Sequence, residues 1–303
     1  MSFSNQVKKE LCALQQKECC RKAQAYGMLL FGKSFSLLAM GIQTENYAAA
    51  KLISECLAEE TGCMIQVSHP SGDGRKFYTI SVDSREERER ILEHFGYTGL
   101  EPNIRVNMAN MEQDCCLSAF LRGAFLTCGT VMDPQKGYRL EFLIPHKNLS
   151  ESFLEFFSQL GDFSIRPKLI RRRGSYVLYL KSSEEIMDLL TYMGAVRSSM
   201  EYMQVKMIKE VRNDVNRRTN FDTANIDKIV SASAQQAEAI RLLAERNRLK
   251  ELPEELQEMA ALRLKYPEMS LRELGEQLDP PITRSGVNHR LRKLTELAEK
   301  LED

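Results

Sequence analysis

The stretches "CCRKAQAYGMLLFGKSFS" (residues 19–36) and "CCLSAFLRGAFLTCGTVM" (residues 115–132) are two versions of one pattern within a single chain. Each begins with a cysteine pair, continues as an apolar helix that contains small residues, and passes into an extended segment. The similarity predicts an internal duplication, which constrains the fold more than any other feature of the sequence.

The elements expected after each copy also repeat. Hydrophobic periodicity and turn residues predict a strand, a helix, a hairpin and a second helix in both halves. They fall at residues 35–43, 47–62, 63–82 and 84–96, and again at residues 138–145, 150–161, 163–181 and 182–194. Ser84 and Ser182 stand at the same point of the two halves, and each is followed within one turn by a pair of glutamates.

Small residues in the first helix of each half indicate how the halves join. Ala23 and Gly27 lie one turn apart in the first copy, and Ala119 and Gly123 do the same in the second. Small side chains at this spacing allow two helix backbones to pack closely, so we expect the two helices to pair about a pseudo-two-fold axis. The expected fold is α+β, a duplicated α/β domain followed by an all-α domain.

Changes in composition divide the chain into four segments. We expect the two α/β halves at residues 1–110 and 111–211, a polar helical connector at 212–250 and a helical domain at 251–303. A flexible linker and a rigid helix both fit residues 212–250.

The composition is typical of a globular protein. Hydrophobic residues make up 43% of the 303 residues and the formal net charge is zero, so any basic surface must be local. No apolar run is long enough to span a membrane and the first residues lack an apolar signal core, so we expect a cytoplasmic protein. The eight cysteines contain no CxxC pair and the four histidines are scattered, so we expect reduced, buried thiols and neither a metal nor a cofactor.

Residues 251–303 predict three short helices. The first ends at Pro267, and the second begins at Ser270 with Glu273 three residues later, which is the pattern of a capping box. Pro280 and Pro281 end the second helix, and the third follows at residues 285–301. This order is typical of a helix-turn-helix, whose last helix enters the major groove of DNA.

The third helix is the expected recognition helix, because its apolar residues lie on one face and its N-terminal half is basic. Residues 283–293 contain four arginines or lysines and a histidine but no acid. Arginine and asparagine match the edges of guanine and adenine, and a helix N-terminus suits a phosphate. The expected DNA-binding residues are Thr283, Arg284, Ser285, Asn288, His289, Arg290, Arg292 and Lys293.

Basic residues also gather in the two predicted hairpins and at the start of the connector. Residues 166–218 hold twelve lysines and arginines against six acids. Contacts to DNA or to a partner fit these residues, and so do ordinary solvated loops. The candidates are Arg75, Lys76, Arg171, Arg172, Arg173, Arg217 and Arg218.

Two segments, "AYGMLLFGK" (residues 25–33) and "LRGAFLTCG" (residues 121–129), resemble the LAGLIDADG motif of homing endonucleases. The resemblance implies two motif helices packed together, sheets that form a saddle over DNA, and an acidic metal ligand near the end of each helix. Those positions here are Gly32 and Cys128, which cannot bind a magnesium ion as carboxylates do. We therefore expect the fold without the cleavage.

Three longer stretches resemble the WhiA family of bacterial regulators: residues 121–142, residues 216–236 with Asn216-Arg217-Arg218, and residues 270–294. The resemblance implies a sequence-specific, nucleoid-associated DNA-binding regulator of transcription tied to cell division, the cell cycle and chromosome segregation, and to sporulation in some relatives. Its implied partners are double-stranded DNA and RNA polymerase or another regulator. An active endonuclease, an RNA-binding maturase-like protein and a ligand sensor are the alternatives, and the oligomeric state stays open.

Overall fold

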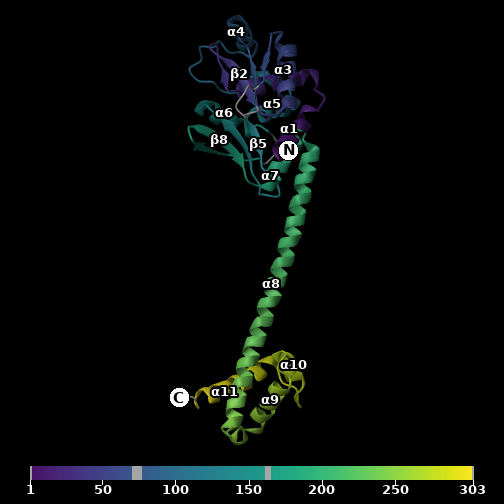
Figure 1. Ribbon diagram of the computed structural model, residues 1–303, viewed down its shortest axis with the longest axis vertical. Helices are drawn as coiled ribbons and strands as arrows, with labels where there is room; N and C mark the ends of the chain where they lie inside the picture. The colour runs from purple at the N-terminus through teal and green to yellow at the C-terminus, as the bar shows by residue number, and fades with distance from the viewer. Residues whose placement is uncertain (1, 70–76, 161–164, 302–303) are drawn as a thin grey trace. The chain divides into compact units, whose positions relative to one another are not determined.

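The computed structural model describes residues 2–69, 77–160 and 165–301 (Figure 1). The chain forms two compact units, Met1–Lys209 and Glu210–Asp303. The first unit combines helices with two antiparallel sheets, and the described part of the second is helical. The structure thus has the α+β composition that the sequence predicts.

The first half of the N-terminal unit is a four-stranded sheet with its helices. Its elements are α1 (Phe3–Cys12), α2 (Glu18–Leu30), β1 (Ser34–Phe35), β2 (Met40–Thr44), α3 (Tyr47–Thr61), β3 (Gln66–Ser68), β4 (Tyr78–Ser81) and α4 (Arg85–His94). The strand order is β1-β2-β4-β3. Burial alternates along β2, where Met40 and Ile42 face the core and Gln43 faces solvent, as period-two patterning requires.

The second half repeats this architecture. Its elements are η1 (Met108–Asn110), α5 (Asp114–Cys128), β5 (Gly129–Val131), β6 (Leu140–Ile144), α6 (Lys147–Phe157), β7 (Lys168–Arg172), β8 (Ser175–Leu180) and α7 (Ser183–Met193). The strand order β5-β6-β8-β7 matches that of the first sheet. The predicted caps also correspond, because Ser84 accepts a hydrogen bond from the Glu87 amide and Ser182 accepts one from the Glu185 amide, both at 3.4 Å. The predicted duplication is confirmed.

Helices α2 and α5 pack against each other at two glycines. A Cβ atom placed at Gly27 would lie 2.3 Å from the carbonyl oxygen of Phe120, and one at Gly123 would lie 2.3 Å from the carbonyl oxygen of Gln24. Real Cβ atoms do not approach oxygen so closely, so this interface requires glycine at both positions. The reciprocal contacts form the pseudo-two-fold joint predicted from the small residues.

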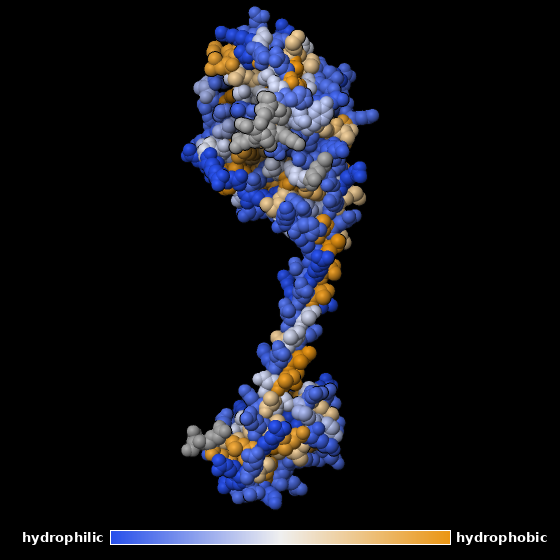
Figure 2. Space-filling view, viewed as in Figure 1, coloured by the Kyte–Doolittle hydropathy of each residue, from blue (hydrophilic) through white to orange (hydrophobic). Residues whose placement is uncertain are grey.

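Helix α8 (Val196–Glu245) is one continuous helix that includes most of the predicted connector. Its first turn is fixed to α1, because the amide and hydroxyl of Ser198 donate to the Glu10 carboxylate at 2.9 and 2.6 Å. Apolar side chains are exposed along its length (Figure 2); they include Met200, Met203, Met207, Val211, Val215 and Phe221. Within the described residues, no helix has both the length and the apolar character that crossing a bilayer requires.

The C-terminal unit is built from the last turns of α8, η2 (Leu249–Glu251), α9 (Glu254–Lys265), α10 (Leu271–Glu276) and α11 (Arg284–Glu299). Ile240 and Leu243 of α8 are buried in its core with residues of the three later helices. These two residues lie before residue 251, where the sequence pattern placed the start of the helical domain. The compact unit starts earlier because α8 supplies one wall of its core.

Candidate nucleic-acid interface

The turn before α10 has the predicted capping box. The Ser270 amide donates to the Glu273 carboxylate at 2.8 Å, and the Glu273 amide donates to the Ser270 hydroxyl at 3.3 Å. The hydrogen bond from the Ser270 amide lowers the pKa of Glu273, so the carboxylate stays ionised at the helix N-terminus. The start of α10 is therefore fixed by local sequence.

The path from α10 to α11 depends on a close backbone contact. The Ile282 amide donates to the Gly275 carbonyl at 3.1 Å, and a Cβ atom at Gly275 would lie 2.4 Å from the Ile282 carbonyl oxygen. Thr283 then caps α11, because its hydroxyl accepts a hydrogen bond from the Gly286 amide at 3.3 Å. These contacts set where the N-terminal end of α11 begins relative to α10.

Helix α11 presents two chemically different faces. Val287, Leu291, Leu294 and Ala298 are buried against the rest of the unit. Seven of the eight predicted DNA-binding residues lie exposed on the remaining surface: Thr283, Arg284, Ser285, Asn288, His289, Arg292 and Lys293. The structure therefore brings these seven residues together at the N-terminal end and outer face of one helix.

The eighth residue, Arg290, lies apart from this set. Its guanidinium forms an ion pair with Glu255 of α9 at 3.1 Å, and only 20% of its side chain is exposed. Arg292 is 68% exposed and pairs with Glu296 one turn later on α11 at 3.1 Å. Arg290 thus links α9 and α11. The Arg292 pair is exposed and therefore weak, so this guanidinium can exchange Glu296 for another anion.

A buried arginine that fixes the segment between α9 and α10 was not among the predicted residues. Arg263 of α9 is 2% exposed and donates to the Met269 carbonyl at 2.8 Å and to the Pro267 carbonyl at 3.4 Å. Ser233 of α8 donates to the same Pro267 carbonyl. Arg263 follows Met259 by four residues on the apolar side of α9, and this position was the available signal.

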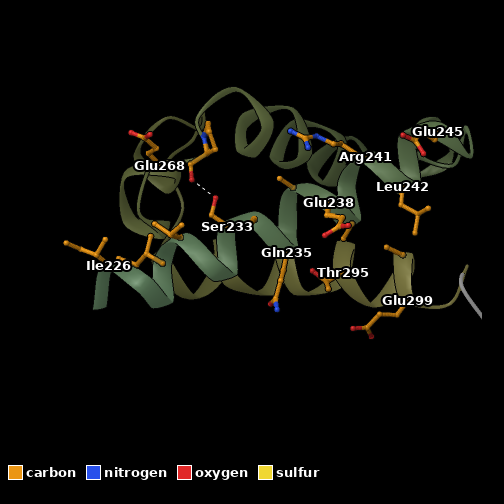
Figure 3. Close-up of a pocket in the computed structure, with 17 residues that line it drawn as sticks. Ile226, Ser233, Gln235, Glu238, Arg241, Leu242, Glu245, Glu268, Thr295 and Glu299 are labelled. Atoms are coloured by element: carbon orange, nitrogen blue, oxygen red, sulfur yellow. Dashed lines mark hydrogen bonds between the residues drawn. The ribbon is translucent and has the colours of Figure 1, made fainter. Parts of the chain in front are cut away.

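A groove of about 1430 Å³ runs between α8 and the C-terminal half of α11 (Figure 3). Its charged lining residues are four glutamates and one arginine: Glu238, Glu245, Glu268, Glu299 and Arg241. Such a lining repels phosphate, so the groove is not an extension of the basic surface on α11.

The second sheet carries the other basic cluster. Arg173 and Gly174 connect β7 to β8 with φ values of 50° and 86°, the positive values of a tight hairpin turn. Arg171, Arg172 and Arg173 are all exposed, and Arg172 pairs with Glu141 at 3.5 Å. The candidates Arg217 and Arg218 are exposed on α8, and the candidates Arg75 and Lys76 lie outside the described residues.

The outer face of this sheet is basic and aromatic. Lys168 and Tyr179 are paired across β7 and β8, and the guanidinium of Arg139 lies 4.6 Å from the centre of the Tyr179 ring. The ammonium of Lys181 lies 5.7 Å from that ring centre. These four residues were not among the predicted site residues. Period-two alternation in "KLIRR" and "SYVLYLK" was a usable signal for Lys168, Tyr179 and Lys181 but not for Arg139.

The first sheet is polar but uncharged at the corresponding positions. In the first sheet, Ser81 is paired with Gln66 on one side and Gly41 on the other. In the second sheet, Tyr179 holds the same position between Lys168 and Glu141. Gln43, on the same face, is exposed and donates to the Thr79 hydroxyl at 3.4 Å. The two halves thus share topology and register but present surfaces of different charge.

The ends of α2 and α5 lie where the sequence placed the degenerate motifs. A Cβ atom at Gly32 would lie 2.7 Å from the Gly41 carbonyl oxygen, so β2 leaves no space for a side chain there. Burial raises the pKa of Cys128, the last residue of α5, to about 12, and the nearby cation Lys8 partly offsets that rise. Lys8 is itself 9% exposed and donates to the Leu126 carbonyl at 3.0 Å.

Comparison with known proteins supports both resemblances. The model of the WhiA C-terminal HTH domain matches residues 215–298, and that of the WhiA LAGLIDADG-like domain matches residues 117–212. A probable cell division protein WhiA from Ruminiclostridium cellulolyticum is 38% identical over 310 residues, which cover 99% of this chain and 98% of that protein. A probable cell division protein WhiA from Clostridium botulinum is 36% identical over 318 residues, which cover 100% and 99%.

A solved structure shows the same fold. The crystal structure of full-length DUF199/WhiA from Thermatoga maritima aligns with a TM-score of 0.60 and 24% identity, and the alignment covers 99% of both chains. The two relatives, which are more than one-third identical over almost their whole length, confirm the predicted family. The chain, with its duplicated LAGLIDADG-like unit and its C-terminal helix-turn-helix, belongs to the WhiA family.

Proposed function

We propose that this protein is a sequence-specific regulator that binds double-stranded DNA through α11 and does not cleave it. The observation that carries the proposal is the exposed, acid-free N-terminal half of α11, where Ser285, Asn288 and His289 lie beside Arg292 and Lys293. Asparagine and arginine offer the paired hydrogen-bonding groups that read adenine and guanine in the major groove. Regulation of transcription in cell division and chromosome segregation is the role proposed for this binding, because the relatives are probable cell division proteins.

The basic sheet of the second half is proposed as a site of sequence-independent phosphate contacts. Lys168, Arg171 and Arg173 are exposed there, and none of them belongs to the recognition helix. Contacts to phosphate strengthen binding to any sequence and make it depend on salt, whereas contacts to bases select a site. The two surfaces would therefore make separable contributions to one activity.

The absence of cleavage is proposed from the ends of α2 and α5. Metal-dependent cleavage needs oxygen ligands around a divalent cation. Gly32 has no space for a carboxylate side chain, and Lys8 lies close enough to Cys128 to offset part of the rise that burial causes in the pKa of this thiol. The Lys8 amine beside this thiol supplies no oxygen ligand for a divalent cation.

Genome-wide recovery of crosslinked DNA tests the proposal. The full-length protein is compared with a His289→Ala, Arg292→Ala double variant and with an Arg248→Ala control. Arg248, like Arg292, pairs with a nearby glutamate, but it lies outside α9, α10 and α11. We expect discrete peaks for the wild type and the control and their loss in the double variant. Peaks that persist in the double variant would contradict the assignment of α11, and a flat wild-type profile would favour RNA or protein partners.

A further inference from the structure

The four cysteines of the two repeated pairs converge on one point of the α2–α5 joint. The sulfur atoms of Cys19, Cys20, Cys115 and Cys116 all lie within 4.8 Å of one another. The Cys19 sulfur is 3.8 Å from that of Cys20 and 3.7 Å from that of Cys115. The spacing along the chain had favoured separate buried thiols over a metal site, but the pairing of the two helices joins the two pairs into one set.

The pseudo-two-fold symmetry builds this set. Both cysteine pairs lie in the first turn of their helix, since α2 begins at Glu18 and α5 begins at Asp114. Each pair reaches the backbone of the other: the Cys20 thiol donates to the Cys115 carbonyl at 3.4 Å, and the Cys116 thiol donates to the Cys19 carbonyl at 3.1 Å. The close approach at Gly27 and Gly123 holds the two helices, and so the four thiols, at this separation.

We propose that Cys19, Cys20, Cys115 and Cys116 bind one zinc ion, which joins the two halves of the N-terminal unit. Zinc in structural sites is tetrahedral, and Zn–S bonds of about 2.3 Å place neighbouring sulfur atoms about 3.8 Å apart. The two S–S separations given above match that value. A cluster with several iron atoms would hold its thiolates around a larger centre, so four sulfurs within 4.8 Å favour a single ion.

The surroundings suit a thiolate centre and allow a metal to enter. The positive ends of two helices meet at the site, and a helix N-terminus stabilises thiolates. Lys17 and Arg122 lie close enough to act electrostatically on Cys115 and Cys20, and their charges offset part of the negative charge that four thiolates bring to one zinc ion. Cys20 and Cys116 are buried, whereas Cys19 is exposed and Cys115 half-buried, so the ion has a path from solvent.

The test measures metal content and thiol accessibility in the full-length protein purified under reducing conditions. We expect one zinc per chain, and we expect cobalt(II) in its place to give the visible absorption of a tetrahedral thiolate complex. Cys19→Ser and Cys115→Ser alter the two more accessible ligands and should each abolish the cobalt spectrum. Cys12→Ser alters a thiol of similar accessibility outside the site and should retain it.

A second measurement uses the wild-type chain, so that it does not depend on a variant folding. Zinc should slow alkylation of Cys19 and Cys115 by at least about ten-fold and leave Cys12 unaffected, because a metal-bound thiolate is not free to attack. The proposal would be overturned if the wild-type chain took up neither zinc nor cobalt. It would also be overturned if the serine variants retained zinc. A disulfide between Cys19 and Cys115 in protein isolated from cells would also overturn it, in favour of a redox pair. None of these outcomes depends on DNA binding by α11.

Discussion

Gly27 of α2 lies against the backbone of Phe120 on α5, so closely that a Cβ atom would be 2.3 Å from the Phe120 carbonyl oxygen. The same distance separates a Cβ atom at Gly123 from the Gln24 carbonyl oxygen. This reciprocal pair sets the distance between the two halves. It therefore also sets the positions of both sheets and of the four cysteines at the helix N-termini.

Gly27→Ala should destabilise the N-terminal unit by about 1–3 kcal/mol, because a methyl group forces the packed helices apart. Hydrogen exchange of amides in α2 and α5 measures the change where it occurs. Gly62→Asn is the control, since Gly62 ends α3 with a φ of 66° and has nothing within 4 Å of its Cβ position. Asparagine tolerates that conformation. Equal losses of hydrogen-exchange protection in both variants would show that the α2–α5 contact does not cause the destabilisation.

Restoring acids at the degenerate motif should not restore cleavage. In a Gly32→Asp, Cys128→Asp variant, the first aspartate meets the Gly41 carbonyl oxygen and the second lies near Lys8. We expect no nicking of supercoiled plasmid with magnesium or manganese, and a less stable N-terminal unit. Metal-dependent nicking by this variant, with none by the wild type, would show that only the two acids are missing.

Glu296→Gln should increase the affinity for duplex DNA. The substitution removes a negative charge from α11 and frees Arg292, whose pair with Glu296 is exposed and therefore weak. The expected gain in affinity is roughly two-fold at low salt, because the free energy of one surface ion pair is small. Fluorescence anisotropy with a recovered genomic fragment measures it, and Glu276→Gln on α10 removes the same kind of pair as a control.

Lys168→Ala should weaken binding to all sequences alike. A lost phosphate contact reduces the magnitude of the negative slope of log K against log salt by about one, while the preference for one site over another is unchanged. Gln66→Ala, at the corresponding register position of the first sheet, should leave both quantities unaltered. An altered site preference with Lys168→Ala would place this sheet at the bases instead of the phosphates.

Arg263→Ala should destabilise the C-terminal unit by about 2–3 kcal/mol, because the buried guanidinium that donates to the carbonyls of Met269 and Pro267 is lost. Hydrogen exchange in α9 and α11 reports the loss. Arg241→Ala, an exposed arginine on α8, should change stability by less than about 0.5 kcal/mol. If Arg263→Ala left exchange in these helices unchanged, the buried arginine would not stabilise α9 and α11.

Local patterns predicted most elements of the fold because they are determined by neighbouring residues. Ser84, Ser182, Ser270 and Thr283 accept hydrogen bonds from amides three residues later, and their helices begin at the next residue. The apolar spacing of Val287, Leu291 and Leu294 likewise predicted the buried face of α11. The exposed basic face of α11 followed, because the opposite face of a helix is known once its buried face is known.

Contacts between distant segments were decided only by the tertiary structure. Arg290 lies within the basic run of α11, but the packing of α9 brings Glu255 to it. Lys168 is paired with Tyr179, and Arg139 lies over the Tyr179 ring, because the strand order places β8 between β6 and β7.

The sequence by itself determined the duplication, which is visible as a repeated pattern. It also determined the helix starts capped by Ser84, Ser182 and Ser270 and the apolar face of α11, because these depend on residue type at short spacing. The tertiary structure alone decided that the sulfur atoms of Cys19 and Cys115 lie 3.7 Å apart. Spacing along the chain specifies neighbours within one helix, whereas a ligand set shared by two helices depends on how closely their backbones pack. In this protein, Gly27 and Gly123 set the distance between the backbones of α2 and α5.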